Sequence, residues 1–357
     1  MNNKIGLVLS GGGAKGSYEI GVFKALEQLG ADKYITDIAG TSVGALNAAL
    51  LETKGGSYAE DLWMKLKFSD LLHFDVSKIP LIGRFGTPNT SPYAASELNF
   101  SPSGGIMEEY IQPLKDFVTN GLPISQKKIA ELIDSHINFY RIRRNIYIMC
   151  SQLGGKLTCF TLNHYAPTMQ KQIILASSAL PGIYRGIVGV EVNGEYYFDG
   201  GVTDEGNTPV SYIYERGCRQ IIVVHLRSNT YTYDPIKYPD ANIINIRPSR
   251  SLGGFLTGTL NLNRPKVRED IDLGYNDILL PDCKSGRTFL ALRMFRRQMT
   301  RMFRRQTTRM FRHHSRHLAY MSASDGFGTP LATAVSRSRR ASSFLPILMR
   351  RSACERR

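Results

Sequence analysis

Near its N-terminus the chain reads Ile5-Gly-Leu-Val-Leu-Ser-Gly-Gly-Gly-Ala-Lys-Gly16, a short apolar run followed at once by glycines. The apolar run is typical of a buried strand. Beyond the glycines, apolar residues recur at helical spacing from Tyr18 to Leu29, and Gly30 stands where a helix would end. This order predicts a strand, a glycine loop and a helix.

A second unit of the same kind follows the first. Ile35–Ala39 is predicted to be a strand, Gly40-Thr-Ser-Val-Gly44 a sharp turn, and residues 45–51 a helix. Two such units in succession favour an α/β fold with a parallel sheet, because crossover helices join neighbouring parallel strands. Further strands are predicted over residues 145–152, 156–162, 196–198, 221–226 and 243–246.

The chain of 357 residues carries a formal net charge of +15, and the excess lies in its C-terminal part. From Gly286 onward there are 17 arginines, no lysine and two acidic residues, whereas residues 1–285 are neutral overall. A neutral body lacks the basic face that a nucleic-acid-binding domain presents. We therefore expect no specific nucleic acid partner for the body.

The cysteines and the hydropathy of the sequence indicate the cellular compartment. The five cysteines are scattered and never spaced as Cys-x-x-Cys, so neither a disulfide framework nor a metal site is expected. No apolar run approaches the roughly 18 residues of a membrane span, and Ile5 follows no signal-peptide profile. The expectation is a cytoplasmic protein, with peripheral contact to a membrane left open.

The glycine loop Gly11-Gly-Gly-Ala-Lys-Gly16 would bring backbone N–H groups together at the start of a helix, where they favour negative charge. That charge is either a phosphate or the oxyanion of an acyl-transfer intermediate. The pattern G-x-G-x-x-G, with Asp37 about 20 residues further on, also fits a dinucleotide site. The loop alone therefore leaves a nucleotide-binding module as an alternative.

The turn Gly40-Thr-Ser-Val-Gly44 fits the pattern G-x-S-x-G between a strand and a helix, the arrangement called a nucleophile elbow. A serine on so tight a turn has a strained backbone, and we expect that side chains at positions 40 and 44 would collide with neighbouring atoms, which explains the glycines there. In return its hydroxyl projects at the start of the following helix. Ser42 is therefore the predicted nucleophile.

A serine nucleophile needs a base, and two residues compete for that role. Asp199 lies in Asp199-Gly-Gly201, where glycines leave room for close approach and offer backbone donors to a carboxylate. His225 ends the apolar strand that begins at Ile221, and the order Ser, Asp, His would match a hydrolase triad. The residues alone leave a dyad and a triad open.

Taken together, the motifs resemble those of the patatin-like phospholipase family. The resemblance runs through Leu7–Gly16, Ala39–Ala48, Ala176–Gly182, Tyr197–Gly201 and Asn207–Pro209, and it extends to Leu273-Gly-Tyr-Asn-Asp277. Several motifs in the family's order are far more specific than a single one. They span most of the neutral body.

The resemblance implies a fold and an assignment of roles. The fold would be a three-layer α/β/α sandwich with a mostly parallel central sheet. Ser42 would be the nucleophile and Asp199 the base of a dyad without a catalytic histidine, and no metal or cofactor would be needed. The remaining motif residues would form the oxyanion hole (Gly11, Gly12, Gly13) or support the motifs (Lys15, Gly16, Gly40, Gly44, Gly200, Gly201).

The chain is expected to contain one acyl hydrolase domain over residues 1–285. Residues 79–123 are rich in proline and glycine and predict a loop-rich insertion or lid. Residues 286–357 contain the repeat Arg293-Met-Phe-Arg-Arg-Gln-Met-Thr300 and predict either a disordered tail or a cationic amphipathic helix.

The predicted function is that of a lipid acyl hydrolase of the phospholipase A or lysophospholipase type. Its substrate would be a phospholipid or a lysophospholipid, cleaved through an acyl-enzyme on Ser42. Two alternatives stay open at this point: a general carboxylesterase acting on small esters, and a nucleotide-binding module that uses the glycine loop.

Overall fold

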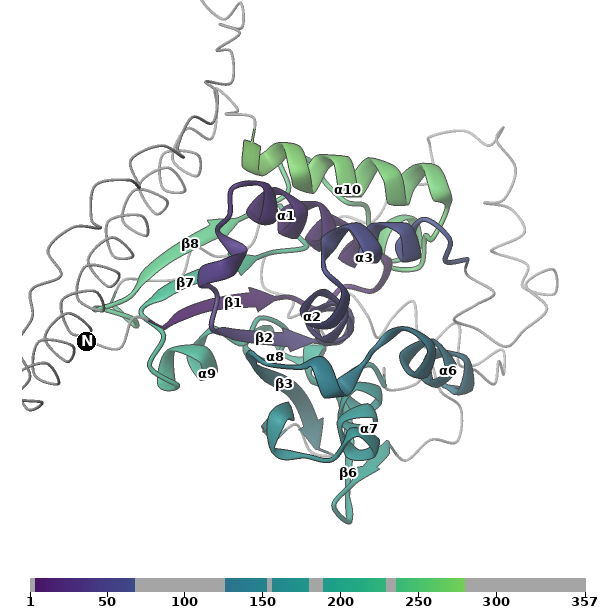
Figure 1. The fold of residues 1–357 in the computed structure, drawn as a ribbon, viewed down its shortest axis with the longest axis vertical. Helices are drawn as coiled ribbons and strands as arrows, with labels where there is room; N and C mark the ends of the chain where they lie inside the picture. Colours follow the sequence, from purple (N-terminus) through teal and green to yellow (C-terminus); the bar gives the residue numbers. More distant parts are fainter. Residues whose placement is uncertain (1–3, 68–125, 153–155, 180–188, 229–235, 280–357) are drawn as a thin grey trace, which may run out of the picture. The chain divides into compact units, whose positions relative to one another are not determined.

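The computed structural model describes residues 4–67, 126–152, 156–179, 189–228 and 236–279 (Figure 1). All of them belong to the first of two units into which the chain divides, Met1–Met299. The predicted insertion over 79–123 and the predicted tail over 286–357 lie outside the described residues. The domain bounds expected from the sequence therefore stay predictions.

One eight-stranded sheet forms the centre of the described fold. Its strand order is β5-β6-β3-β2-β1-β7-β8, with β4 paired to β3. The pairs β3–β2, β2–β1, β1–β7 and β7–β8 are parallel, whereas the pairs that involve β4, β5 and β6 are antiparallel. The strands are β1 Ile5–Leu9, β2 Asp37–Thr41, β3 Asn145–Gln152, β4 Leu157–Thr161, β5 Val190–Val192, β6 Glu195–Asp199, β7 Gln220–Val224 and β8 Asn242–Ile246.

Helices cover both faces of this sheet (Figure 1). The α-helices are α1 Ser17–Gln28, α2 Val43–Lys54, α3 Gly56–Trp63, α6 Lys127–His136, α7 Pro167–Ser177, α8 Asp204–Asn207, α9 Val210–Glu215 and α10 Arg264–Leu279. A 3-10 turn, Gly13–Gly16, precedes α1, and a π-helical turn, Phe255–Thr259, precedes α10. The expected α/β fold with a mostly parallel central sheet is confirmed.

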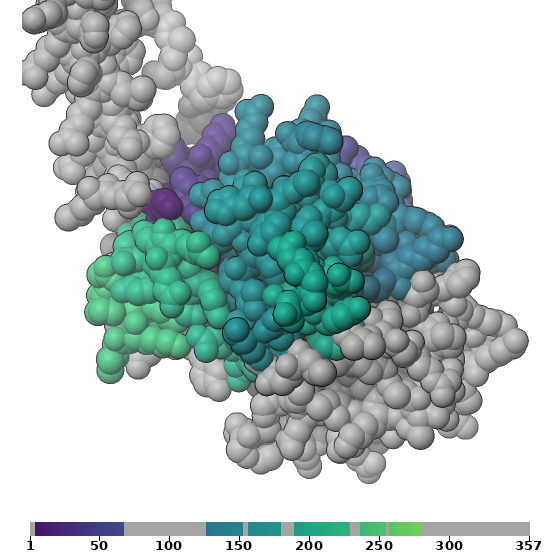
Figure 2. Space-filling view, turned by 90° about the horizontal axis from the view of Figure 1, so that it is seen from below, coloured from purple at the N-terminus to yellow at the C-terminus, as the bar shows by residue number. Residues whose placement is uncertain are grey.

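The strand β1 owes its place at the centre of the sheet to its composition. All five residues of Ile5–Leu9 are buried, as expected of a parallel strand covered on both faces. Viewed from below, the coloured surface is formed mainly by later segments, in blue, teal and green, and the purple N-terminal part shows only along the upper rim (Figure 2). The glycine loop that follows β1 is thus held by a fully enclosed strand.

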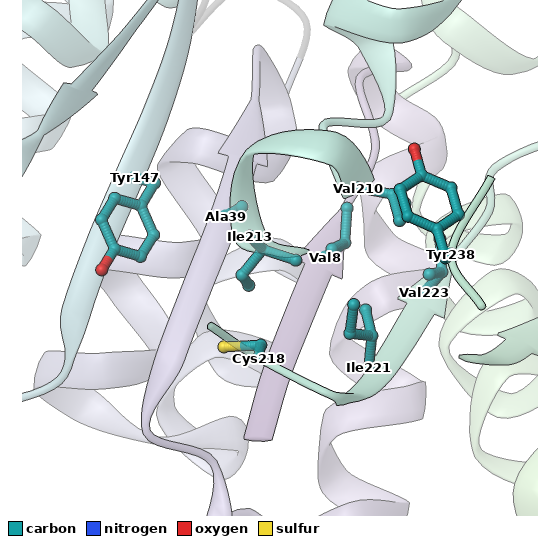
Figure 3. Packing of buried hydrophobic residues seen from close by; sticks show 9 residues of the cluster. All are labelled: Val8, Ala39, Tyr147, Val210, Ile213, Cys218, Ile221, Val223 and Tyr238. Carbon is teal, nitrogen blue, oxygen red and sulfur yellow. The ribbon is translucent and has the colours of Figure 1, made fainter. Parts of the chain in front are cut away.

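One face of the sheet packs against the short helix α9. Side chains from four strands meet this helix in a buried cluster (Figure 3). The helix lies so close to β1 that a β-carbon added at Gly6 would lie 2.7 Å from Ile213 Cδ1. The alternation of side chains along a strand puts Val8 on this face and Leu7 and Leu9 on the other. The cluster consists of Val8, Ala39, Tyr147, Val210, Ile213, Cys218, Ile221, Val223 and Tyr238.

On the other side, α1 and α10 cross at unusually close range. A β-carbon at Gly21 of α1 would lie 1.9 Å from the carbonyl oxygen of Ile271, and one at Gly274 of α10 would lie 2.1 Å from that of Tyr18. The Tyr18 hydroxyl donates to Asp277 Oδ2 at 2.8 Å, which fixes the register of the two helices. Helix α10 thereby holds α1, the helix that follows the glycine loop.

We expect Gly274→Ala to lower the free energy of unfolding by about 1–3 kcal/mol, because its methyl group would collide with backbone rather than with a flexible side chain. Glycine in a helix is otherwise less favourable than alanine by roughly 0.5–1 kcal/mol. Urea denaturation measures the change. Asn276→Ala, at an exposed position of the same helix, is the control and should be neutral or slightly stabilising. A stabilised Gly274→Ala variant would contradict the close crossing.

Candidate active site

Ser42 lies between strand β2 and helix α2 with a backbone conformation that few residues adopt. Its φ of 56° and ψ of −123° place it in the positive-φ region, where a side chain other than hydrogen is strained. Gly40 and Gly44 explain how the turn is possible: a β-carbon at either would lie 2.4 Å from a carbonyl oxygen, that of Gly44 or of Leu9. The steric reason predicted for both glycines is thus present in the structure.

Asp199 is the last residue of strand β6. Its position along the sheet relative to Ser42 is determined by the pairing of both strands with β3. Thr41, the residue before Ser42, pairs with Met149 of β3, and the next residue of β3, Cys150, pairs with Asp199. The end of β2 and the end of β6 therefore meet on either side of the same strand. This register brings Ser42 and Asp199 together, although 156 intervening residues separate them in the sequence.

The carboxyl group of Asp199 is fully buried. Its Oδ1 accepts a hydrogen bond from the Gly201 amide at 2.7 Å, while Oδ2 has no hydrogen bond of good geometry from the described residues. Burial raises the pKa of Asp199 from 3.8 to about 7, and the hydrogen bonds of the Ser42 hydroxyl and the Gly201 amide oppose this change. A carboxylate of this kind is a stronger base than an ordinary aspartate.

The glycine loop faces the same spot from strand β1. A β-carbon at Gly11 would lie 3.3 Å from Ser42 Cβ, so the start of the loop lies against the serine. The Gly11 amide donates to the carbonyl oxygen of Asn207 at 3.1 Å and is thereby occupied. The amides of Gly12 and Gly13 donate no hydrogen bond within the described part of the chain. Of the three predicted oxyanion donors, these two are thus without a hydrogen-bond acceptor among the described residues.

The supporting residues of the motifs each have a packing reason. Gly13 has a φ of +58°, and a β-carbon there would lie 2.5 Å from the carbonyl oxygen of Thr259. At Gly16 a β-carbon would lie 2.5 Å from Val43 Cγ2, and at Gly200 it would lie 2.7 Å from the Met149 carbonyl oxygen. Lys15 is buried, with its Cε near Gly258 of the π-helical turn. These contacts hold the loop against α2 and the π-helical turn.

Several supporting residues have no signal of their own in the sequence. Ser177 Oγ accepts a hydrogen bond from the Ser42 amide at 2.9 Å and donates to the Met149 carbonyl oxygen at 2.7 Å. Thr41 Oγ1 donates to the Gly206 carbonyl oxygen at 2.6 Å, which ties the elbow to α8. Both residues lie inside family-like motifs, but only the fold shows what they hold.

His225, the other candidate base, pairs with a side chain of the neighbouring strand β8. Its side chain is buried and its Nε2 pairs with Asn245 Oδ1 at 2.8 Å. Burial lowers the pKa of His225 to about 4; the hydrogen bond with Asn245 opposes this change and the charge of Arg247 adds to it. In this environment the aspartate is a stronger base than the histidine, which reverses their usual order.

We expect His225→Ala to keep kcat for ester hydrolysis within about tenfold of wild type, whereas loss of a triad member costs about 10³-fold or more. The same change should lower the free energy of unfolding by about 1–3 kcal/mol, because it empties a buried position and leaves Asn245 unpaired. Steady-state kinetics and urea denaturation measure the two effects. If His225→Ala lost as much kcat as Ser42→Ala, a Ser-Asp-His triad would replace the proposed dyad.

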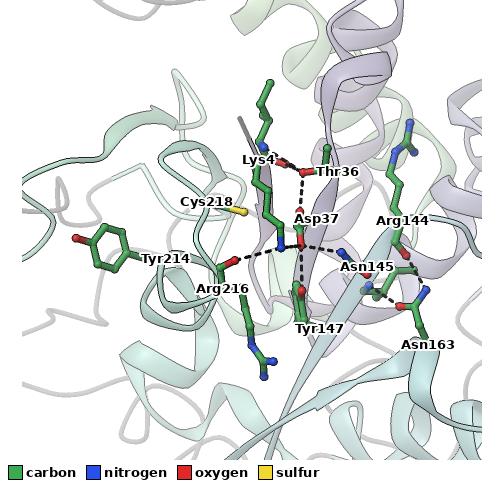
Figure 4. Close-up of polar contacts among 12 residues, drawn as sticks. Lys4, Thr36, Asp37, Arg144, Asn145, Tyr147, Asn163, Tyr214, Arg216 and Cys218 are labelled. Carbon is green, nitrogen blue, oxygen red and sulfur yellow. Dashed lines mark hydrogen bonds and ion pairs between the residues drawn. The ribbon is translucent and has the colours of Figure 1, made fainter. Parts of the chain in front are cut away.

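The dinucleotide interpretation of Asp37 is wrong. Asp37 pairs in register with Gly6 and Asn145, at the amino ends of the strands, whereas the glycine loop follows the carboxyl end of β1. It is fully buried and accepts hydrogen bonds from Thr36, Asn145 and Tyr147 (Figure 4). A ribose-binding acid stands at the carboxyl end of its strand, so Asp37 lies at the wrong edge of the sheet.

Two features are absent from the described ranges, one that concerns metal ions and one that concerns membranes. Within those ranges, no three or more histidine, cysteine, aspartate or glutamate side chains are grouped so that they could hold a metal ion. In the same ranges, no helix combines the length and the apolar character needed to cross a membrane.

Comparison with known proteins gives relatives of two kinds. An uncharacterized Escherichia coli protein, YjjU, is 26% identical over 237 residues, which cover 65% of this chain and 54% of that protein. Lysophospholipase NTE1 of Candida glabrata is 27% identical over 237 residues, which cover 66% of this chain and 11% of that protein. The chain thus spans about half of the first relative's length and about a tenth of the second's.

Among solved structures, VipD from Legionella pneumophila matches 77% of this chain and 66% of its own, with 16% identity and a TM-score of 0.43. Human GIVD cytosolic phospholipase A2 matches 83% of this chain and 59% of its own, with 11% identity and a TM-score of 0.43. The family model described as patatin-like phospholipase matches residues 7–213, more than half of the chain. The chain belongs to the patatin-like phospholipase family.

Proposed function

We propose that this chain is a lipid acyl hydrolase of the phospholipase A or lysophospholipase type, acting on phospholipid or lysophospholipid esters. The proposal rests above all on one observation. The strained Ser42 lies against a buried carboxyl group, Asp199, whose pKa is raised to about 7. A hydroxyl next to a base of that strength, in a site whose glycine loop has two backbone amides without an acceptor among the described residues, is suited to acyl transfer.

In the first half of the reaction Asp199 accepts the proton of the Ser42 hydroxyl while Oγ attacks the carbonyl carbon of the ester. The amides of Gly12 and Gly13 stabilise the negative charge that develops on the carbonyl oxygen. The tetrahedral intermediate then collapses, and the proton on Asp199 passes to the departing alcohol oxygen. The products are a free lysolipid or glycerophospho-alcohol and an acyl group bound to Ser42.

In the second half, water enters and gives its proton to Asp199 as its oxygen attacks the acyl carbonyl. The same amides stabilise the second tetrahedral intermediate. Ser42 Oγ leaves, regains its proton from Asp199, and the fatty acid is released. Each proton taken by Asp199 is thus returned, so the carboxylate is regenerated and no other reagent is needed.

The lipid class of the substrate is supported by the relatives. The family model and the NTE1 relatives carry the words phospholipase and lysophospholipase in their names. This chain matches only part of those proteins. The proposed reaction is therefore argued from the geometry of the site, and the relatives support only the class of substrate. Peripheral contact with a lipid surface belongs to the same proposal, since an ester in an aggregate must reach Ser42.

The test compares aggregated and monomeric esters on the purified full chain. Fatty-acid release is measured from palmitoyl-lysophosphatidylcholine micelles, from phosphatidylcholine vesicles and from p-nitrophenyl butyrate. We expect release from at least one lipid, at a higher kcat/KM than for the small ester. Hydrolysis of p-nitrophenyl butyrate alone would overturn the lipid proposal in favour of a general carboxylesterase. A folded protein that hydrolyses none of the three would overturn the enzyme itself.

A further inference from the structure

Glu19 is a buried acid that the dyad does not use. It lies in the first turn of α1, its side chain is fully enclosed, and its Oε2 accepts a hydrogen bond from Asn47 Nδ2 at 2.8 Å. Its other oxygen, Oε1, is buried and has no hydrogen-bond partner among the described residues. A buried oxygen without a partner costs much more free energy when it belongs to a charged carboxylate than when it belongs to a neutral acid, so this environment favours the neutral form of Glu19.

The contacts of Glu19 span the glycine loop. The backbone amide of Ser10, directly before the loop, donates to the Glu19 carboxyl group. Asn47 Nδ2 donates to the Gly16 carbonyl oxygen at 3.0 Å as well as to Glu19, so it ties the end of the loop to the same group. Glu19 and Asn47 together therefore connect both ends of the segment that contains the Gly12 and Gly13 amides.

The same network reaches the nucleophile helix and the next helix along the chain. Asn47 belongs to α2, which begins directly after Ser42, and its Oδ1 accepts a hydrogen bond from Trp63 Nε1 of α3 at 3.1 Å. Asn47 thus uses both its donor and its acceptor groups inside the protein. A change at Glu19 acts on the loop, on α2 and on the environment of the Trp63 ring.

We propose that Glu19, as a neutral carboxylic acid, is the positioning residue of the oxyanion loop, and that placing a negative charge on it loosens the loop and slows acyl transfer. This inference rests on the proposed function, since it assigns a task to the loop in that reaction. Glu19 acts through Ser10, Asn47 and Gly16 and touches no reacting atom.

The electrostatic surroundings agree with this role. Burial raises the pKa of Glu19 to about 8, and the donors Asn47 and Ser10 oppose the change only in part. Among the charged groups of the neighbouring elements, Lys24 pairs with Glu60 and Asp277 accepts from Tyr18, while the Lys15 side chain lies with its Cε close to Gly258. With Asp199 as the base, activity should rise through about pH 7 and fall again above about pH 8.

Trp63 provides a readout of the network that does not depend on activity. It is the only tryptophan of the chain, so its fluorescence reports on this position alone. In the wild type we expect the Trp63 emission to change with a midpoint near pH 8, when Glu19 becomes charged. Glu19→Gln, which keeps the shape but holds no ionisable proton, should remove this step. A wild type without the step, or a Glu19→Gln variant that retains it, would overturn the proposal.

Kinetics provide the second arm. Glu19→Ala should lower kcat for a soluble ester by about 10²-fold over the whole pH range, as expected when oxyanion donors lose their position. Glu19→Gln should rescue most of that loss and extend activity to higher pH. Glu27→Gln, on the same helix but paired with the Gly56 amide, is the matched control and should leave the pH profile unchanged. An alkaline limb that persists in Glu19→Gln would contradict the inference.

The two arms separate failure of this inference from failure of the proposed function. If the protein hydrolyses no ester but the Trp63 titration depends on Glu19, the network stands and the proposed reaction fails. If hydrolysis depends on Ser42, but the Trp63 titration and the loss of activity at alkaline pH are the same in wild type and Glu19→Gln, the proposed reaction stands and the positioning role fails. If Glu19→Ala does not fold, the nearly isosteric Glu19→Gln still decides.

Discussion

Ser42→Ala is expected to lose at least about 10⁴-fold in kcat for ester hydrolysis, because the variant lacks the hydroxyl that forms the proposed acyl-enzyme. The variant should fold, since the elbow is held by the Ser42 amide on Ser177 and by the close contacts at Gly40 and Gly44, none of which involves the hydroxyl. Intact mass after reaction with a fluorophosphonate probe measures the nucleophile directly. Wild type should gain one adduct and Ser42→Ala none.

The backbone of the elbow offers a second readout for the same residue. Alanine at a φ of 56° keeps the strain, whereas glycine relieves it, so Ser42→Gly should be more stable than Ser42→Ala by about 1 kcal/mol. Ser211→Ala, at a surface position paired with Glu205, is the control and should keep both activity and labelling. Full activity of purified Ser42→Ala would end the assignment of the nucleophile.

The strands that the sequence predicts well are those with long apolar runs. Strand β3 was expected over 145–152 and is found at Asn145–Gln152, because its buried run is bounded by polar residues. Strand β5, Val190–Val192, was not predicted, since two buried valines around an exposed glutamate give no run and the strand depends on pairing with β6. Strand β2 extends to Thr41 rather than ending at Ala39, because its pairing with β3 continues through Gly40.

For the site, short-range sequence patterns identify the residues that carry a steric signature. Ser42, Asp199 and the glycines stand out because tight turns and close approaches restrict which residues fit. Supporting groups such as Ser177, Asn47 and Trp63 carry no such signature, because an ordinary serine, asparagine or tryptophan becomes important only when the fold brings it to its partner. The reversed base strengths of Asp199 and His225 likewise follow from burial, which the sequence does not show.

Asp199→Asn is expected to lose about 10⁴-fold or more in kcat, because asparagine keeps the shape and the Gly201 hydrogen bond but accepts no proton from Ser42. The wild-type profile of kcat/KM should fall on the acid side with a midpoint near pH 7, where Asp199 becomes protonated. Stopped-flow or steady-state kinetics on a soluble ester measures both. An Asp199→Asn variant with wild-type kcat would remove Asp199 from the mechanism.

The same substitution should increase stability, which a merely structural aspartate would not do. Burial raises the pKa of Asp199 in the folded state from 3.8 to about 7, so between these pH values the folded protein holds the extra proton and its stability falls as pH rises. Above pH 7 the buried charge costs at most about 4 kcal/mol, at roughly 1.4 kcal/mol per pKa unit. Asp199→Asn should therefore unfold at higher urea concentration than wild type at pH 8, with little difference at pH 4. Asp204→Asn, at an exposed position, should show no such gain. If Asp199 is a catalytic carboxylate in a site that disfavours its charge, Asp199→Asn should thus be both inactive and more stable than wild type. A less stable Asp199→Asn variant would contradict this explanation.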